Sequence, residues 1–293
     1  MSRSTSGPAD PAVQRLNGYG LRLASQLAVP GAVADAGDAP PDIMIALDPP
    51  APTEAGPVYA LTPDGLQFIC SGVGTYRISA DAIAVVPDPD AAPGSVSGML
   101  VATALPALLW LRGRLVLHAA AARLPGGGAV ALAGGTGRGK STVLARLVDA
   151  GAALVGDDTI AFDADTGRCA SGLAGGWFAG AGDDGRRTFV EATPGRACAS
   201  AAIGAILVLD ARDAGDGSVV RLDPVAAVTH LLASLHRPRV PALLGRAGDT
   251  LHHATLLAGQ IPLYSWRRRK GSAILTLAEF EMLARIGAER EIE

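Results

Sequence analysis

Gly134-Gly-Thr-Gly-Arg-Gly-Lys140-Ser141 is the stretch of sequence on which the fold of this chain depends. It fits the pattern Gly-x4-Gly-Lys-Ser, and it lies between an apolar run at 128–133 and a segment from 140 whose apolar residues recur at helical spacing. Glycines let successive backbone N–H groups converge on an anion, and the N-terminus of the following helix adds partial positive charge. The alternative, a chance turn in a chain with 37 glycines, is disfavoured by the correct flanks. The stretch therefore predicts a strand, a phosphate-binding loop and a helix.

This loop predicts a site for ATP or another nucleoside triphosphate. Lys140 is expected to reach the β- and γ-phosphates, and the Ser141 hydroxyl is expected to be a ligand of Mg²⁺. The residues predicted to bind the nucleotide are Gly134, Gly135, Thr136, Gly137, Arg138, Gly139, Lys140, Ser141 and Thr142.

Composition limits the possible partners and the compartment. The chain has 293 residues, 49% of them apolar, so it can bury a large core, and its net charge of −3 gives no general reason to bind nucleic acid or an anionic membrane. Three cysteines are too few for a disulfide framework, and the polar first residues lack the apolar run of a signal peptide. We therefore expect a cytoplasmic protein without nucleic-acid or membrane partners, and homo-oligomerisation stays open.

The chain divides into three predicted parts. Residues 1–18 are expected to be a flexible N-terminus, 19–93 a small β-rich N-terminal domain, and 94–293 a larger α/β domain that contains the glycine loop. Met99–Leu111 is the most apolar window, but it is shorter than the roughly 20 residues that span a bilayer. We interpret it as a buried helix that contains Pro106.

Further elements follow from apolar periodicity and turn residues. In the N-terminal domain the expected strands are 21–25, 43–47, 66–70, 75–78 and 82–86. In the larger domain we expect a hairpin of 115–123 with 128–133, strands near 153–155, 203–209 and 261–266, and helices near 224–235 and 277–288.

Two adjacent carboxylates follow the apolar strand Leu154-Val-Gly-Asp157-Asp158. One carboxylate near the phosphates can bind Mg²⁺, while the other can accept the proton of an attacking hydroxyl. A solvent-facing turn is the structural alternative. A second apolar strand, Ile206-Leu-Val-Leu-Asp210, also ends in a carboxylate and is the competing metal-binding strand.

Leu117-His118-Ala119, the glycine loop and Leu154-Val-Gly-Asp157-Asp158 together resemble the HPr serine kinase/phosphorylase family. The resemblance is best over residues 100–165, weaker over 19–99 and poor beyond 170. The order of the parts is most similar to the HPr-kinase-like proteins of lasso peptide biosynthesis, which phosphorylate a C-terminal serine of a precursor peptide. The chain has no counterpart of the family signature Glu-Ile-Arg-Gly-Leu-Gly, so the resemblance does not extend to HPr itself as substrate.

This resemblance implies a P-loop kinase domain of the HPr-kinase/phosphoenolpyruvate-carboxykinase type, acting on a peptide or small protein that bears a serine. It implies that Asp157 contacts the substrate hydroxyl, that Asp158 helps to hold the metal, and that His118 lies near the phosphates. The candidate catalytic residues are therefore Asp157, His118 and Lys140. The alternatives are a nucleotide-binding regulatory module with little transfer activity and an HPr-type protein kinase. The other four histidines lack metal-ligand spacing and are interpreted as structural: His230, His236, His252 and His253.

Overall fold

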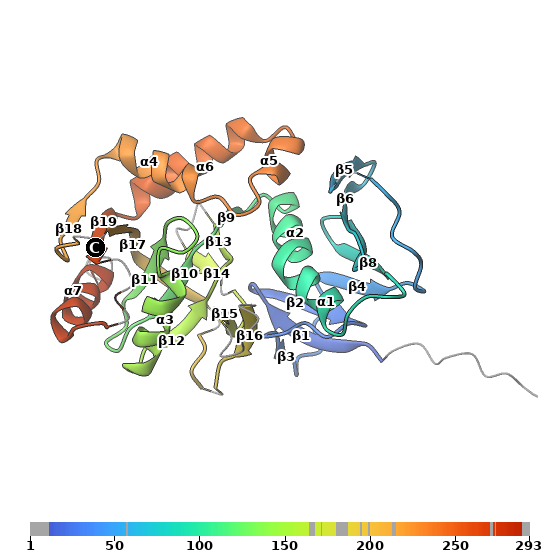
Figure 1. The fold of residues 1–293 in the computed structure, drawn as a ribbon, viewed down its shortest axis with the longest axis horizontal. Coiled ribbons are helices and arrows are strands. Elements are labelled where there is room, and N and C mark those ends of the chain that lie inside the picture. Colours follow the sequence, from blue (N-terminus) through green and yellow to red (C-terminus); the bar gives the residue numbers. More distant parts are fainter. Residues whose placement is uncertain are drawn as a thin grey trace, which may run out of the picture.

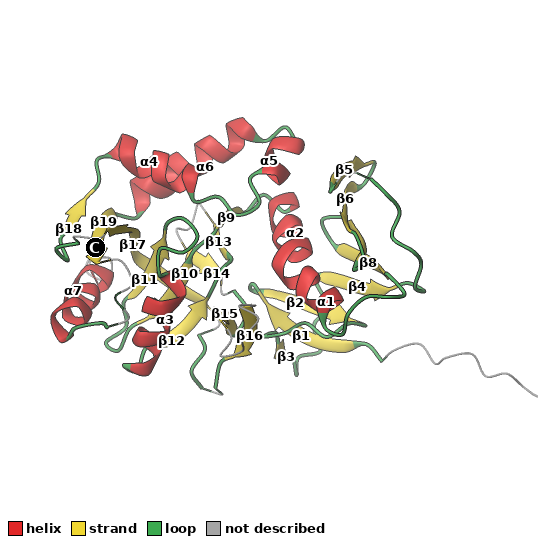
Figure 2. Cartoon of the chain, viewed as in Figure 1, coloured by secondary structure: helices red, strands yellow, loops and turns green. Residues whose placement is uncertain are grey.

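The computed structural model describes residues 12–56, 58–163, 168–170, 172–179, 187–193, 195–198, 200–212, 215–269, 272 and 274–288. These residues form a mixed α/β structure with two large sheets (Figures 1 and 2). None of the helices in these ranges combines the length and the apolar character needed to cross a bilayer.

The N-terminal sheet has the strand order β3-β1-β2-β4-β8-β7-β6-β5, with β4 parallel to β2 and β8 and the other pairs antiparallel. Its strands are β1 (Gln14–Gly18), β2 (Leu21–Ser25), β3 (Val33–Ala34), β4 (Ile43–Leu47), β5 (Tyr59–Thr62), β6 (Gly65–Cys70), β7 (Gly74–Ile78) and β8 (Ala82–Pro87). The five strands expected here are confirmed. The predicted boundary at residue 19 is wrong, because residues 14–18 pair with β2 and belong to the sheet.

A helix joins the two sheets, and it lies between them in Figure 1. It consists of α1 (Ser95–Met99), a π-helical segment η1 (Leu100–Ala104) and α2 (Leu105–Leu111). Pro106 has no N–H group, so it cannot donate to the Ala102 carbonyl, its partner in a regular α-helix. The N–H group of Leu105 donates instead to the Leu100 carbonyl, which is the π-helical pattern. The predicted buried helix is therefore present, with a π segment just before its proline.

The larger sheet has the order β12-β10-β11-β17-β14-β13-β9. Outside this order, β19 pairs with both β17 and β18. Its strands are β9 (Leu115–Leu117), β10 (Ala120–Arg123), β11 (Ala129–Ala133), β12 (Ala153–Gly156), β13 (Ile160–Asp163), β14 (Arg168–Ala170), β17 (Ser200–Arg212), β18 (Val219–Arg221) and β19 (Leu263–Arg269). Strand β17 is parallel to β11 and β19. A separate pair consists of β15 (Gly175–Ala179) and β16 (Arg187–Glu191).

Helices cover both faces of the part of the sheet formed by β11, β17 and β19. They are α3 (Lys140–Asp149), α4 (Pro224–Ala233), α6 (Ala247–Gln260) and α7 (Leu277–Ala288), whereas α5 (Arg239–Leu243) contacts α2, α6 and β5. Leu144 of α3 and Leu283 of α7 belong to one buried cluster, whereas Leu231 of α4 and Leu257 of α6 belong to the other. The result is a three-layer arrangement with α4 and α6 opposite α3 and α7 (Figure 1).

The two sheets share one hydrophobic core. A single buried cluster contains Ile43 and Ile83 of the N-terminal sheet, Leu105 and Leu108 of α2, and Leu115 of the larger sheet. Helix α2 therefore packs against both sheets, and this shared cluster crosses the boundary predicted near residue 93, while a second cluster lies wholly within the larger segment.

Truncation of Leu108 is expected to destabilise both parts together. Leu108→Ala removes a fully buried side chain, and such changes cost about 2–5 kcal/mol. Urea unfolding followed by circular dichroism should show one transition, shifted as a whole. The matched control is Leu277→Ala, because Leu277 is 74% exposed, and it should change stability by less than about 0.5 kcal/mol. Two separate transitions in the wild-type protein would contradict the shared core.

Candidate functional site

The glycine loop connects β11 to α3, as the sequence predicts. Gly134, Gly137 and Gly139 have φ values of 127°, 77° and 90°, a region in which any residue with a Cβ is strained. Gly139 is the N-cap of α3 and offers no side-chain acceptor to the first turn of the helix. The loop therefore presents a helix N-terminus at the end of a central strand, which is the arrangement that binds phosphate groups.

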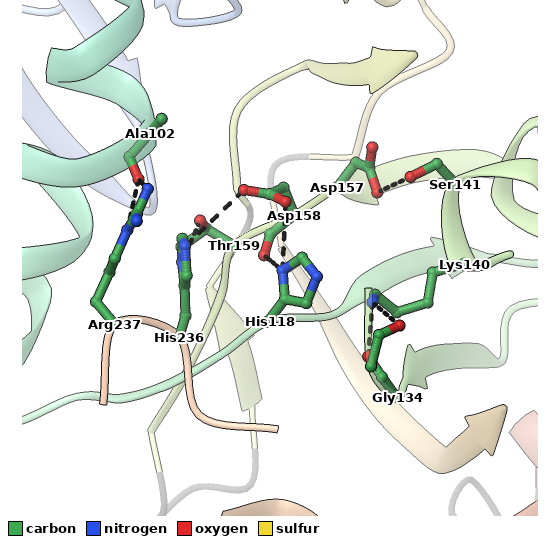
Figure 3. Close-up of polar contacts among 11 residues, drawn as sticks. Ala102, His118, Gly134, Lys140, Ser141, Asp157, Asp158, Thr159, His236 and Arg237 are labelled. Atoms are coloured by element: carbon green, nitrogen blue, oxygen red, sulfur yellow. Dashed lines mark hydrogen bonds and ion pairs between the residues drawn. The ribbon is translucent and has the colours of Figure 1, made fainter. Parts of the chain in front are cut away.

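Lys140 lies over this loop and is buried. Its Nζ donates to the carbonyl oxygens of Gly134 at 2.7 Å and Gly135 at 3.3 Å. Figure 3 shows the ammonium group beside the start of the loop, where an anion held by the loop would lie next to it. This position places a positive charge where phosphate oxygens would gather.

The site forms where two chain segments change their pairing partners. The segment at 115–123 leaves β13 and joins β11 and β12, with His118 at the break between β9 and β10. The segment at 153–163 leaves β10 and joins β9, with Asp157 and Asp158 at its break. Because both breaks lie outside regular strand pairing, these side chains can gather at the end of β11.

The two aspartates have different neighbours. Asp157 is buried, and the Ser141 hydroxyl donates to its Oδ1 at 3.1 Å. Asp158 adopts a left-handed conformation with φ of 68°, and its Oδ1 lies 3.3 Å from Nδ1 of His118. The backbone carbonyl of Asp158 also lies 3.1 Å from that nitrogen. The structure thus brings Ser141, both aspartates and His118 together, and the roles assigned to them stay predictions.

A short antiparallel bridge brings His236 to the same place. His118 N donates to the Ser234 carbonyl at 2.7 Å, and His236 N donates to the Val116 carbonyl at 2.9 Å. The His118 and His236 rings lie 5.8 Å apart, and Nε2 of His236 is 3.9 Å from Oδ2 of Asp158 (Figure 3). His236, which the sequence analysis interprets as structural, therefore lies beside His118 and Asp158.

Arg237 is held by the Ala102 carbonyl, whose donor in a regular α-helix would be the N–H group that Pro106 lacks. Its Nη2 and Nε donate to the Ala102 oxygen at 2.7 and 3.2 Å. The indole of Trp110, on the same helix, donates to the His236 carbonyl at 2.8 Å. The helix between the two sheets thus positions the segment that carries His236.

A cavity of about 400 Å³ opens between the glycine loop and these groups. Its lining includes Thr136 of the loop together with His118, Asp158, His236 and Arg237. Asp157 is not part of this lining and faces Ser141 instead. The cavity can therefore hold a group that approaches the loop from the side of Asp158 and the two histidines.

Asp210, the competing carboxylate, lies in a neighbouring cavity. That cavity is lined by Gly134, Gly135 and Arg138 of the loop and by residues of β17, β19 and α4. Asp210 therefore adjoins the start of the loop, whereas the Ser141 hydroxyl meets Asp157. The contact between Ser141 and Asp157 is consistent with the prediction that the Asp157-Asp158 pair, and not Asp210, supplies the metal-binding and acid–base carboxylates.

Sequence reasoning missed His236 and Arg237 because they lie far along the chain, after α4. No spacing rule connects residues 234–237 to His118, since the bridge between them is tertiary. The only sequence signal was Pro106 inside an apolar helix, which predicts an unbonded carbonyl and hence a donor from elsewhere. Thr142, by contrast, lies in the first turn of α3 as expected and is exposed.

Comparison with known proteins adds no further assignment, since no protein-family model matches the chain and no curated protein sequence matches it.

Burial lowers the pKa of His236 from 6.5 to about 4, against the opposing effect of the Asp158 charge. The unfolded chain therefore binds more protons than the folded chain between these two values, so stability falls as the pH drops through this window. Lowering the pH from 7 to 5 should cost about 2 kcal/mol through His236, with no contribution above about pH 7.

We expect His236→Gln to reduce this loss of stability between pH 7 and pH 5 by about 2 kcal/mol. The measurement is urea unfolding of wild type and variant at both pH values. His252→Gln, on the exposed side of α6, is the matched control and should keep the wild-type pH dependence. An unchanged pH dependence in His236→Gln would show that the imidazole is not buried in its neutral form.

Proposed function

We propose that this protein is a Mg²⁺-dependent kinase that transfers the γ-phosphoryl group of ATP to a serine of a peptide or small protein. The observation that carries the proposal is the 3.1 Å contact between the loop hydroxyl of Ser141 and Asp157, beside the cavity that contains Asp158. The site combines a phosphate-binding loop, a serine and a carboxylate that can hold a metal ion (Ser141 and Asp157), and a second carboxylate (Asp158). We accordingly assign the larger sheet to the P-loop kinase type of HPr kinase and phosphoenolpyruvate carboxykinase.

In this proposal the loop and Lys140 hold the phosphates, and Lys140 offsets the charge that grows during transfer. Ser141 and Asp157 would hold Mg²⁺, which would supply positive charge to offset that of the phosphates. The serine Oγ attacks the γ-phosphorus, its proton passes to an aspartate, and ADP leaves with the electrons of the broken P–O bond. The acceptor enters through the cavity lined by Asp158 and the histidines.

The contacts favour roles for the two aspartates that differ from the roles implied by the resemblance. Asp157 is buried against Ser141, the predicted Mg²⁺ ligand, so Asp157 is the better placed to support the metal. Asp158 lines the cavity, so it is the better placed to take the proton of the acceptor. We therefore propose Asp157 on the metal side and Asp158 as the base.

The substrate proposal is a peptide with a serine at its C-terminus, as in lasso-type precursor peptides. Its support is the resemblance over residues 100–165, together with a cavity lined by both Arg237 and Asp158.

Lys140→Ala is expected to weaken ATP binding and to stop transfer, because the ammonium contacts the phosphates in both the ground and transition states. The measurement is the mass of a serine-bearing precursor peptide after incubation with protein, ATP and Mg²⁺, alongside calorimetric ATP affinity. Arg146→Ala is the control, because Arg146 lies on the same helix but pairs with Asp149 on the surface. ATP binding by the wild type without any gain in peptide mass would favour the regulatory-module alternative.

The two aspartates should respond differently to replacement by asparagine. Asp157→Asn is expected to lose Mg²⁺-dependent ATP affinity, whereas Asp158→Asn should bind ATP normally and transfer about 10²- to 10⁴-fold more slowly, the usual cost of losing a general base. Calorimetry with and without Mg²⁺ and single-turnover phosphorylation separate the two effects. The reverse pattern would restore the division implied by the resemblance. Retained transfer in both variants, with loss in Asp210→Asn, would move the site to β17.

A further inference from the structure

A second cavity lies beside the cavity that contains Asp158 and the two histidines, and Arg237 lines both. We call the first the transfer cavity and the second the side cavity. The side cavity has a volume of about 430 Å³ and is formed by the N-terminal sheet, the helix between the sheets and the start of α5. No residue of the glycine loop belongs to its lining as the structure describes it, so a triphosphate on the loop does not account for this cavity.

Part of the side cavity is apolar and aromatic. Tyr59 of β5, Phe68 of β6 and Met99 of α1 line it, and the rings of Tyr59 and Phe68 lie 5.4 Å apart. Val58, which also lines the cavity, is 51% exposed. The ring of Phe68 lies 5.4 Å from that of the buried Tyr76, so the core of the sheet holds the aromatic wall in place. Such a wall is suited to an apolar side chain of a ligand.

The remaining wall is positively charged. Arg237 and Arg239 both line the side cavity. The guanidinium of Arg237 is held by the Ala102 carbonyl, whereas Arg239 is an exposed side chain at the start of α5. Among the residues that the structure describes, no carboxylate lines this cavity or forms an ion pair with either guanidinium. The cavity is therefore complementary to a ligand that carries a negative charge beside an apolar group.

Strand β5 lies at the edge of the N-terminal sheet, where β6 is its one partner among the described strands. The N–H group of Ile69 donates to the Val58 carbonyl at 2.9 Å, so the alternation of an antiparallel ladder turns the N–H and C=O groups of Tyr59 away from β6. Helix α5 contacts β5, and residues of both elements line the side cavity (Figure 1). An extended peptide can pair with the backbone of an edge strand, so this position favours a peptide as the occupant.

We propose that the side cavity is a docking site for the acceptor peptide, in which an apolar side chain of the peptide lies on Tyr59 and Phe68 and a carboxylate pairs with Arg239. This inference rests on the proposed kinase function. It gives that function a substrate class, namely a peptide with an apolar and an acidic residue close to the serine. Because the two cavities meet at Arg237 and an extended residue spans about 3.3–3.6 Å, a few residues of peptide connect them.

Peptide binding can be measured without any transfer. The probes are short fluorescein-labelled peptides with one serine in a Gly/Gln background and a Phe-Glu pair at successive positions before or after the serine. Fluorescence anisotropy with the full-length protein gives their affinities. We expect at least one Phe-Glu peptide to bind about 10-fold more tightly than the peptide without the pair, because burial of the phenyl ring adds to the ion pair.

Charge exchange tests Arg239 directly. Arg239→Glu should weaken binding of the tightest Phe-Glu peptide about 3- to 30-fold, because repulsion between like charges replaces an ion pair. The Phe-Lys version of that peptide should then bind this variant more tightly than the Phe-Glu version does. Arg285→Glu is the matched control, because Arg285 is an exposed arginine of α7 that lines neither cavity, and it should keep the wild-type preference.

Tyr59 tests the aromatic wall. Tyr59→Ala should weaken binding of the Phe-Glu peptide and leave the Gly/Gln peptide unchanged, whereas Tyr59→Phe, which keeps the ring, should bind like the wild type. In single-turnover phosphorylation, Arg239→Glu and Tyr59→Ala should raise the peptide concentration needed for half-maximal rate. The maximal rate and the ATP affinity should stay within about twofold, because neither side chain lines the transfer cavity.

Three results would overturn the proposal: no position of the Phe-Glu pair that improves binding, an equal loss of affinity in Arg285→Glu, or a loss of ATP affinity in Arg239→Glu, which would assign the side cavity to the nucleotide. A change of oligomeric state in Arg239→Glu, measured by light scattering, would also overturn it in favour of a contact between copies of this chain. Absence of transfer in the wild type would contradict the kinase function alone, and anisotropy would still decide whether the side cavity binds a peptide.

Discussion

The antiparallel bridge between Leu117 and Leu235 is the constraint on which the site depends. Its two backbone hydrogen bonds attach the segment after α4 to the strand that ends at His118. Without this bridge, His236 and Arg237 would have no reason to lie near the glycine loop, since almost 100 residues separate them from it along the chain. Ser234 and Leu235, in the segment that forms the bridge, also line the cavity. A few backbone bonds between distant segments therefore determine which side chains can meet a bound phosphate.

The helix between the two sheets also holds the segment that contains His236 and Arg237. Pro106 leaves the Ala102 carbonyl without its regular helical donor, and the guanidinium of Arg237 takes that place. Trp110 adds a second bond to the backbone of His236. Because the same helix packs its leucines into a core shared by both sheets, the site is fixed to the packing of the whole molecule. Because Pro106 cannot donate to the Ala102 carbonyl, that carbonyl is free of its regular helical donor and binds Arg237, which attaches the segment after α4 to the helix.

Groups suited to anions lie on the loop side of the site, and carboxylates lie on the side that faces it. The loop side carries the ammonium of Lys140 and the N-terminus of α3, both suited to anions. The facing side carries two carboxylates, one turned to Ser141 and one turned to the histidines, which suits a cation and a proton. Asp158 adopts a left-handed conformation, and its carboxylate lies beside His118, whereas the carboxylate of Asp157 accepts from Ser141. Backbone geometry, therefore, gives two identical side chains different neighbours.

Local patterns in the sequence were enough to predict the glycine loop, α3, the carboxylate pair, α7 and most strands, because each depends on periodicity or turn chemistry within about 15 residues. They also predicted that His118 lies near the loop, although only through a resemblance. The position of β1, the pairing of β9 with β13, and the positions of His236 and Arg237 beside the loop could not be predicted in this way. Each of these depends on backbone hydrogen bonds or side-chain contacts between segments far apart in the chain, and such contacts leave no period in the sequence. The sequence by itself determined the glycine loop and the helix that follows it, and only the tertiary structure decided which side chains lie beside that loop, because this depends on the pairing of distant strands.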